Sequence, residues 1–268
     1  MRIAQKLYEG INIGSETTGL ITYMRTDGVQ LSSQAIEELR NEISNRHGKS
    51  YIPDNPRVYK SKAANAQEAH EAIRPTDIAR DPESISSYLD AEQFKLYDLI
   101  WKRTISSQMQ SAELDETATD ISSKDQSITF RANGSQVIFP GFFVYRDKED
   151  DRLLPKFNEK EEVDLSKVES DQHFTQPPPR YTDASLIKKM EELGIGRPST
   201  YASILQVLIN RNYVEKEKGK HVAQERGRIL TAFLNNFFGK YIEYDFTACL
   251  LYTSPSPRDR GWSRMPSS

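Results

Sequence analysis

Cysteine is almost absent from this sequence, because only one of its 268 residues, Cys249, is a cysteine. A single thiol excludes a disulfide framework and a cysteine-rich zinc site. No apolar run approaches the roughly 20 residues that a membrane-spanning helix needs, and the N-terminus lacks the apolar stretch of a signal peptide. With 37% hydrophobic residues and a mean hydropathy of −0.68, the composition favours a soluble cytoplasmic protein without a membrane partner.

A strong excess of one charge is also missing. The net charge is −3 and the pI is about 5.9, which argues against a non-specific binder of polyanions. The charge is uneven, however: residues 1–80 hold 11 basic and 10 acidic side chains, residues 81–176 hold 11 and 20, and residues 177–248 hold 11 and 8. A nucleic-acid partner would therefore meet the first and third blocks, with the acidic middle facing away or acting as a spacer.

Ten residues of the first block combine a tyrosine with a nearby arginine: Gly19-Leu-Ile-Thr-Tyr-Met-Arg-Thr-Asp-Gly28. Read as an extended segment, this stretch places Tyr23, Arg25 and Asp27 on one face. Arginine can bind a phosphate through two hydrogen bonds, and a neighbouring cation makes a phenol of ordinary pKa about 10 easier to ionise and to use as a nucleophile. The alternative is that Tyr23 simply packs a strand.

Apolar periodicity predicts helices over residues 33–46 and 91–112, and a shorter one around residues 3–7. Ser32 or Ser33 is expected to cap the first, and Asp90 with Gln93 to form a capping box for the second.

A further helix is expected over residues 66–73, ending before a proline. Its spacing puts His70 and Arg74 on one face. The cations nearby favour a phosphate contact for His70 over a merely structural role.

Between residues 114 and 170 the apolar period changes to two, which indicates an antiparallel β segment. Short strands are predicted around residues 117–121, 128–130, 137–139 and 163–165. Turns are predicted at Lys124-Asp125, at Asn133-Gly134 and in a charged loop at 146–152, and three prolines at 177–179 act as a stiff joint.

The last block reads as helix, turn, helix, hairpin and helix. Asp183 is expected to cap a helix over 184–193, which Gly194 ends, and the further elements fall at 201–210, 213–223 and 227–238. This order is that of a winged helix-turn-helix, which holds a helix against DNA. A small helical bundle with a solvated hairpin tip fits the same pattern.

Residues 249–268 read like the translation of a transposase-type sequencing adapter, and we exclude them from the expected fold. The alternative is a genuine tail rich in proline, serine and arginine.

Three long signatures have to be weighed together. They are Gly-Leu-Ile-Thr-Tyr-Met-Arg-Thr-Asp, Ala-Gln-Glu-Ala-His-Glu-Ala-Ile-Arg-Pro-Thr and Gly-Ile-Gly-Arg-Pro-Ser-Thr-Tyr-Ala. With Gln176-Pro-Pro-Pro-Arg-Tyr-Thr they resemble bacterial DNA topoisomerase I, a type IA enzyme, over essentially all of residues 1–248. The resemblance implies an α+β multidomain fold: a helical gate domain over 1–110, a β-rich arch over 111–180 and a helical, winged-helix-like base over 181–248.

The resemblance also implies roles for single residues. Tyr23 would be the nucleophile that takes a 5′-phosphotyrosine link, and Arg25 would steady the scissile phosphate. His70, Arg74, Arg197 and Thr200 would bind the DNA, and Asp27 and Ser199 would position it. The implied activity is ATP-independent relaxation of negatively supercoiled DNA through a single-stranded segment, by a monomer in the cytoplasm. Gly28 stands where the family usually has serine.

The family binds Mg²⁺ through an Asp-x-Asp-x-Glu cluster in a Toprim domain, and this cluster does not occur in the sequence. We therefore expect Met1 to be an internal methionine or a gene-call start, and a fragment that does not relax DNA by itself. Three alternatives remain open: a winged-helix DNA-binding module without chemistry, a purely structural fragment, and another type IA enzyme such as topoisomerase III.

Overall fold

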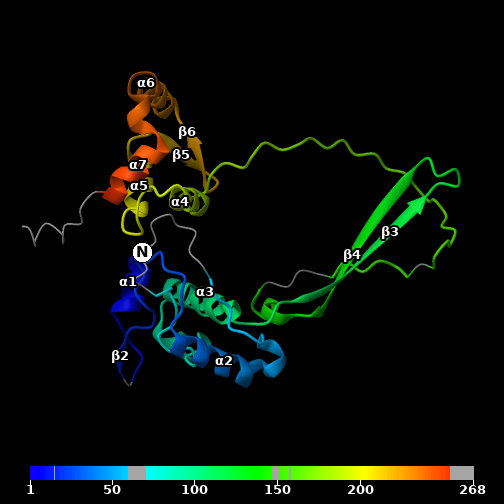
Figure 1. The fold of residues 1–268 in the computed structure, drawn as a ribbon, viewed down its shortest axis with the longest axis horizontal. Coiled ribbons are helices and arrows are strands. Elements are labelled where there is room, and N and C mark those ends of the chain that lie inside the picture. Colours follow the sequence, from blue (N-terminus) through cyan, green and yellow to red (C-terminus); the bar gives the residue numbers. More distant parts are fainter. Residues whose placement is uncertain (15, 60–70, 147–150, 157, 254–268) are drawn as a thin grey trace, which may run out of the picture.

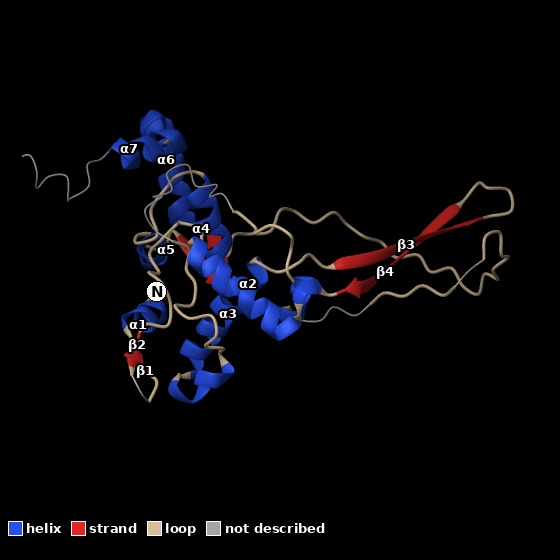
Figure 2. Cartoon of the chain, turned by 60° about the horizontal axis from the view of Figure 1, so that its bottom comes forward, coloured by secondary structure: helices blue, strands red, loops and turns tan. Residues whose placement is uncertain are grey.

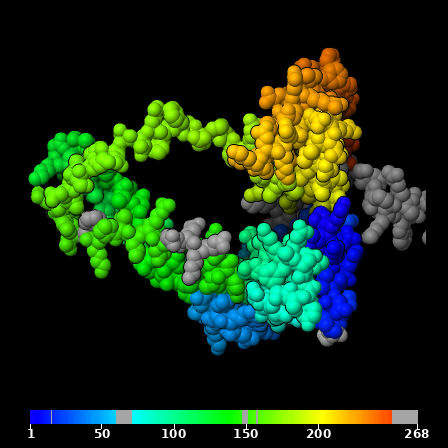
Figure 3. Space-filling model, turned by 180° about the vertical axis from the view of Figure 1, so that it is seen from behind, coloured from blue at the N-terminus to red at the C-terminus, as the bar shows by residue number. Residues whose placement is uncertain are grey.

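The chain runs out from one helical group along a β ribbon and returns to a second helical group (Figure 1). This computed structural model describes residues 1–14, 16–59, 71–146, 151–156 and 158–253. A space-filling view shows an opening framed by the ribbon, the returning chain and the two helical groups (Figure 3). The combination of helices with separate antiparallel pairs confirms the predicted α+β class. In the part of the chain that the structure describes, no helix is both long enough and apolar enough to cross a bilayer.

The first helical group forms because each main helix has a clear start signal. Its elements are α1 (Arg2–Glu9), β1 (Ile11–Asn12), β2 (Thr17–Thr18), α2 (Ser33–His47), the 3-10 turns η1 (Lys49–Tyr51) and η2 (Glu83–Tyr88), and α3 (Ala91–Ser107). Ser32, not Ser33, caps α2 by accepting a hydrogen bond from the backbone of Ala35. The predicted capping box of Asp90 and Gln93 is present at the start of α3.

Helix α3 ends at Ser107, several residues earlier than predicted. The side chain of Gln108 is fully buried and bonds to both backbone groups of Arg57: its Nε2 donates to the carbonyl at 2.9 Å and its Oε1 accepts from the amide at 3.1 Å. This anchor takes the place of a further helical turn.

One hydrophobic core holds the first helical group together, and it is drawn from all three helices and from the segments between them. Its buried members are Leu7, Leu20, Ile21, Met24, Leu39, Ile43, Ile78, Ile85, Tyr97, Trp101, Ile105 and Met109. The helix predicted over residues 91–112 rests on an apolar stripe of Phe94, Tyr97, Trp101, Ile105 and Met109. The last four are confirmed as core, whereas Phe94 is only half-buried and lies outside it. Leu20, Ile21 and Met24 are part of this core, so the segment that carries Tyr23 is fixed by burial on both sides of the tyrosine.

The ribbon is a single long hairpin that projects from the helical groups (Figure 2). Strand β3 (Glu113–Ser122) pairs antiparallel with β4 (Thr129–Phe139), and the 3-10 turn η3 (Gly141–Tyr145) follows. The turn predicted at Lys124-Asp125 is confirmed, whereas the one predicted at Asn133-Gly134 is wrong, because β4 continues through it. Gly134 pairs with Thr117, and a Cβ there would lie 2.7 Å from the carbonyl of Arg152, which bonds to Ser135.

The chain returns from the ribbon without regular structure. The strand predicted at residues 163–165 is wrong: residues 161–181 are all exposed and belong to no strand. An alternating apolar pattern forms a strand only where a neighbouring strand satisfies its backbone groups. No other described segment lies in register with this one.

The second helical group has the predicted winged-helix order. Its elements are α4 (Asp183–Glu192), α5 (Tyr201–Asn210), β5 (Val214–Glu217), β6 (Lys220–Ala223), α6 (Glu225–Ile242) and α7 (Tyr244–Thr253). The cap of α4 is Thr182 in a capping box with Ser185, not Asp183 as predicted. Helix α7 continues past residue 248 and includes the first residues, 249–253, of the predicted adapter-derived tail. The rest of that tail, residues 254–268, lies outside the described part.

Asp183 instead attaches the β5–β6 hairpin to α4. His221 lies 2.8 Å from its Oδ1 through Nε2, and Lys216 donates to its Oδ2. The hydrogen bond from Lys216, assisted by the one from His221, holds the pKa of the Asp183 carboxyl below its usual range despite some burial. The hairpin is therefore fixed to the start of α4.

Candidate active site

The segment around Tyr23, which the sequence analysis treats as extended, forms no regular strand. Only Ile21 makes a β-bridge, to Pro75, and the chain bends at Thr22, Met24 and Arg25. The bends do not remove the alternation of burial next to the tyrosine. Met24 is 7% exposed, whereas Tyr23 is 37% exposed and Arg25 also faces solvent. A tyrosine with a buried neighbour on one side and a surface-accessible ring suits a nucleophile that must reach a bound strand.

Thr22, which sequence reasoning missed, holds this segment to the Ala72–Pro75 stretch. Its backbone amide donates to the carbonyl of Arg74 at 2.9 Å. Its hydroxyl donates to the carbonyl of Ala72 at 2.8 Å and accepts from the amide of Arg74 at 2.9 Å. Thr76 adds two more bonds, from its amide to Leu20 and from its hydroxyl to Gly19. Two signatures that are fifty residues apart thus form one hydrogen-bonded unit.

Arg74 lies inside this unit rather than open to a ligand. Its Nε and Nη2 donate to the two carboxylate oxygens of Glu71 at 2.8 and 3.1 Å, and its Nη1 donates to the carbonyl of Pro75 at 2.9 Å. Burial alone would raise the pKa of Glu71, but hydrogen bonds from Arg74 and Ser32 outweigh it and hold that pKa below its usual range. The side chain predicted to bind DNA is here one half of an ion pair.

The helix predicted over residues 66–73 is wrong for the part that the structure describes. Residues 71–73 are not helical, and the amide of Ala72 donates to the carbonyl of Gln30 instead. His70 lies outside the described residues. The shared helical face expected for His70 and Arg74 therefore has no support.

Asp27 and Gly28 follow the bends. The amide of Gly28 donates to the hydroxyl of Thr26 at 2.9 Å, and Gly28 is not one of the glycines with a positive φ. A serine, the residue usual in the family, could adopt the same backbone conformation at this position. The departure from the family pattern removes a hydroxyl and does not reflect a conformation that only glycine allows.

The Gly194–Thr200 turn between α4 and α5 is closed by its own side chains. The hydroxyl of Thr200 accepts from the amide of Arg197 at 2.9 Å and donates to its carbonyl at 3.1 Å. Gly196 has φ +85°, and a Cβ there would lie 2.9 Å from the ring of Tyr201, so only glycine fits. Ser199 and Thr200 are exposed, and Arg197 is half-buried with one bond, from Nη1 to the carbonyl of Gly196. The turn is closed by these hydrogen bonds, with Ser199 and Thr200 at the surface and the half-buried Arg197 two residues before Ser199.

This turn faces the Tyr23 segment across the junction of the two helical groups. The second group lies directly against the N-terminal residues in the space-filling view and in the ribbon view (Figures 1 and 3). Burial, followed by the charges of Glu191 and Asp27, raises the pKa of Tyr201. Asp27 belongs to the Tyr23 segment and Tyr201 is the first residue of α5, directly after the turn, so the two segments are close enough for their charges to interact.

Among the described residues there is no group of three or more histidine, cysteine, aspartate or glutamate side chains that could hold a metal ion. The residues around Tyr23 therefore do not fit a divalent cation by themselves. We assign no step of the chemistry to a metal.

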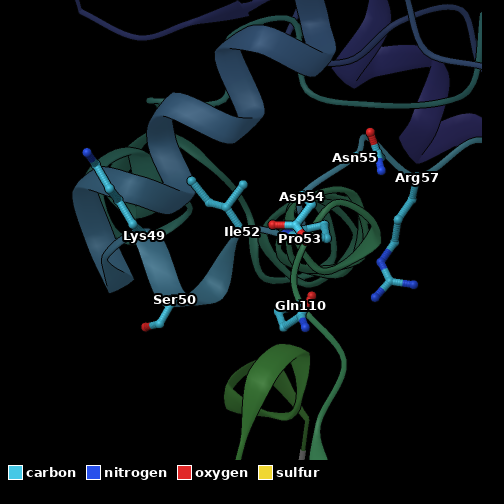
Figure 4. A pocket seen from close by; sticks show the side chains of 8 residues that line it. All are labelled: Lys49, Ser50, Ile52, Pro53, Asp54, Asn55, Arg57 and Gln110. Carbon is cyan, nitrogen blue, oxygen red and sulfur yellow. The ribbon is translucent and has the colours of Figure 1, made fainter.

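An open groove lies elsewhere in the first helical group. It has a volume of about 580 Å³ and is lined by polar side chains that include Lys49, Arg57 and Gln110 (Figure 4). Arg57 is already bonded to the carbonyl of Met109 and the hydroxyl of Ser111. No residue of the Tyr23 segment lines this groove, so we do not include it in the candidate site.

The site therefore consists of a surface tyrosine, Tyr23, on a segment that is hydrogen-bonded to a second, distant signature. A turn with one arginine, from the second helical group, faces this segment. Comparisons with known proteins show the family of the chain. A family model described as DNA topoisomerase matches residues 1–253. The chain is 54% identical over 257 residues to DNA topoisomerase 1 of Rickettsia conorii and 49% identical over 261 residues to that of Xylella fastidiosa, covering 93% of this chain each time. The chain therefore belongs to the bacterial type IA DNA topoisomerases.

A solved structure extends this likeness to three dimensions. Full-length topoisomerase I from Thermotoga maritima matches with a TM-score of 0.81 and 38% identity, over 93% of this chain and 40% of that one. The chain spans about a third of the length of the curated relatives, 33% for Rickettsia conorii and 32% for Xylella fastidiosa.

Proposed function

We propose that this chain is the part of a bacterial topoisomerase that carries the nucleophile, and that the whole enzyme relaxes negatively supercoiled DNA without ATP. In this proposal residues 1–110 form the gate, residues 111–180 the arch on which the gate moves, and residues 181–248 the base. The observation that carries it is the surface-accessible Tyr23 on a segment pinned by Thr22 and faced by the basic turn at Arg197.

The chemistry is an exchange of one phosphodiester for another. The Tyr23 oxygen attacks a backbone phosphorus of a single strand, the tyrosine O–P bond forms, and the bond from phosphorus to the 3′-oxygen breaks. The phenol loses its proton and the departing 3′-oxygen gains one, which leaves a 5′-phosphotyrosine. The number of phosphoester bonds is unchanged, so the reverse attack by the 3′-hydroxyl reseals the strand without ATP.

Each neighbouring residue has a role in this proposal. Arg25 is close in sequence and exposed, and it would stabilise negative charge on the phosphate in the transition state. Arg197 and Thr200 would contact the backbone of the strand, with Asp27 and Ser199 positioning it. His70 would contribute a second phosphate contact. Arg74 would act by fixing the Thr22 segment, because its donors are paired with Glu71 and Pro75.

The parent enzyme would use Mg²⁺, act on a single-stranded segment as a monomer, and work in the bacterial cytoplasm on the nucleoid. Any Mg²⁺ ligands would come from residues outside the described part of this chain. We expect purified residues 1–248 not to relax DNA, and Mg²⁺-dependent relaxation by that fragment would contradict this expectation.

A full-length chimera tests the nucleophile. Residues 1–248 replace the matching third of the Rickettsia conorii enzyme, and a 3′-labelled single-stranded oligonucleotide reports the covalent adduct on a denaturing gel. We expect the chimera to form the adduct and Tyr23→Phe to lose it while DNA affinity stays the same. Tyr88→Phe, at another exposed tyrosine of the first helical group, is the matched control.

A non-catalytic winged-helix module predicts a different result. In that case Tyr23→Phe would leave the adduct unchanged, or the chimera would bind DNA and form none. Either outcome sinks the proposed role of Tyr23.

A further inference from the structure

A second tyrosine, Tyr8, lies next to Tyr23. The two ring centroids are 5.5 Å apart and the ring planes meet at 71°, an edge-to-face arrangement. This distance and angle fall in the range that aromatic pairs prefer. Tyr8 is 42% exposed and Tyr23 37%, so the pair lies at the surface with each ring covering part of the other.

The backbone fixes Tyr8 against the same segment. Leu7 and Leu20 are fully buried, and the amide of Leu20 donates to the carbonyl of Leu7 at 2.7 Å. A Cβ on Gly19 would lie 2.5 Å from the carbonyl oxygen of Tyr8. The two backbone segments therefore touch at a point where only glycine fits without a shift. The last turn of α1 and the Tyr23 segment therefore share a backbone hydrogen bond, a close backbone approach and a ring contact.

The backbone is anchored on both sides of Tyr23. Thr22 is bonded to Ala72 and Arg74 on one side of the tyrosine, and Met24 is buried on the other, so the Cα position is set. The edge-to-face contact with Tyr8 restricts rotation of the Tyr23 ring from the side of α1.

We propose that Tyr8 is a positioning residue, whose ring holds the phenol of Tyr23 in the orientation needed for attack on the phosphorus. The inference rests on the proposed function, in which Tyr23 is the nucleophile. Attack requires a near-linear approach of the oxygen to the phosphorus, and loss of orientation slows such a step without weakening strand binding. The strength of an aromatic pair corresponds to about a 2- to 12-fold change in rate.

The full-length chimera carries the test, with Tyr8 changed to alanine, phenylalanine and leucine. We expect Tyr8→Ala to lower the single-turnover rate of adduct formation at saturating DNA by about 2- to 12-fold, with an unchanged KM for the oligonucleotide. Tyr8→Phe keeps the ring and should restore the parent rate, whereas Tyr8→Leu should not. Tyr88→Ala is the matched control for loss of an exposed tyrosine, and thermal melting of each variant reports loss of fold.

The outcomes separate this inference from the function on which it rests. If the chimera with Tyr8 intact forms no adduct, the proposed function fails. If it forms the adduct and Tyr8→Ala matches it in rate, the positioning role alone is overturned. The positioning role is also overturned if Tyr8→Leu keeps the parent rate as well as Tyr8→Phe does, because the bulk of the side chain would then account for the effect. It is overturned too if Tyr8→Ala changes only the KM or the melting temperature, because the effect would then lie in binding or in the fold.

Discussion

At the scale of the residue, the site depends on side chains that no motif logic selects. Thr22 connects the two signatures through three hydrogen bonds, and Glu71 takes two of the donors of Arg74. In the sequence, both stand next to more conspicuous residues, Thr22 before Tyr23 and Glu71 after His70. Thr22 matters because its hydrogen-bond partners lie about fifty residues away in the sequence. Glu71 matters because the chain bends between it and Arg74, which brings the two side chains together. Local spacing in the sequence shows neither contact.

The Glu71–Arg74 pair should contribute stability that depends on pH. Because the pKa of Glu71 is lower in the folded protein than its ordinary value of about 4.5, the unfolded state binds the proton more readily. This stability is present above about pH 4.5 and is lost as the pH falls through the folded pKa. We expect Glu71→Gln in the chimera to reduce the free energy of unfolding at pH 7 and to flatten its fall between about pH 5 and pH 3.

Urea unfolding at a series of pH values measures this effect. Glu38→Gln, at an exposed carboxylate bonded to Gln34 within α2, is the control for the loss of one acid. If Glu71→Gln and Glu38→Gln alter the pH profile equally, the ion pair has no special share in stability.

At the scale of the element, close backbone approaches decide where segments meet. Gly19 against Tyr8 and Gly134 against Arg152 are both places where a side chain would collide with a carbonyl. The first sets the Tyr23 segment on α1, and the second lets the chain after the ribbon lie against β4. Neither glycine has a positive φ, so space rather than backbone conformation requires them.

Gly19→Ala should therefore disturb the site. The new Cβ would be 2.5 Å from the carbonyl oxygen of Tyr8, so the segment must shift. We expect the free energy of unfolding of the chimera to fall by about 1–3 kcal/mol and adduct formation to slow. Gly239→Ala in α6 has nothing within 4 Å and should be neutral or stabilising by up to about 1 kcal/mol. Equal effects of the two substitutions on unfolding and on rate would contradict this account.

At the scale of the whole molecule, charge is separated along the chain. The acidic middle, residues 81–176, includes α3 as well as the ribbon and most of the returning stretch. Arg25 and Arg197 lie on segments that are close to each other at the junction of the helical groups. A stripe on α6 formed by Ile229, Phe233, Phe237 and Tyr241 is also exposed. Such a stripe is typical of a helix that packs against another element.

Salt dependence tests this charge separation. If Arg197 contacts a phosphate of single-stranded DNA, its loss should reduce the slope of log affinity against log salt by about 0.7. Arg131→Ala, on the ribbon and paired with Asp120, is the control and should leave the slope unchanged. Titrations of the chimera with a fluorescent oligonucleotide at several salt concentrations provide the measurement. An unchanged slope for Arg197→Ala would remove this residue from the strand-binding surface.

The sequence by itself determined the main helices, the β5–β6 hairpin and the family, because caps, apolar periodicity and long motifs are local properties of the chain. The capping box at Asp90 and the α3 stripe are examples. Only the tertiary structure decided the bends around Tyr23, the unbroken β4 at Asn133-Gly134 and the lack of a strand near residue 163. The bends depend on the hydrogen bond between Arg74 and Thr22, and the unbroken β4 depends on Arg152 lying against Gly134. The stretch near residue 163 forms no strand because it has no strand partner among the described residues. Burial and hydrogen bonding across fifty residues are not encoded in any local pattern.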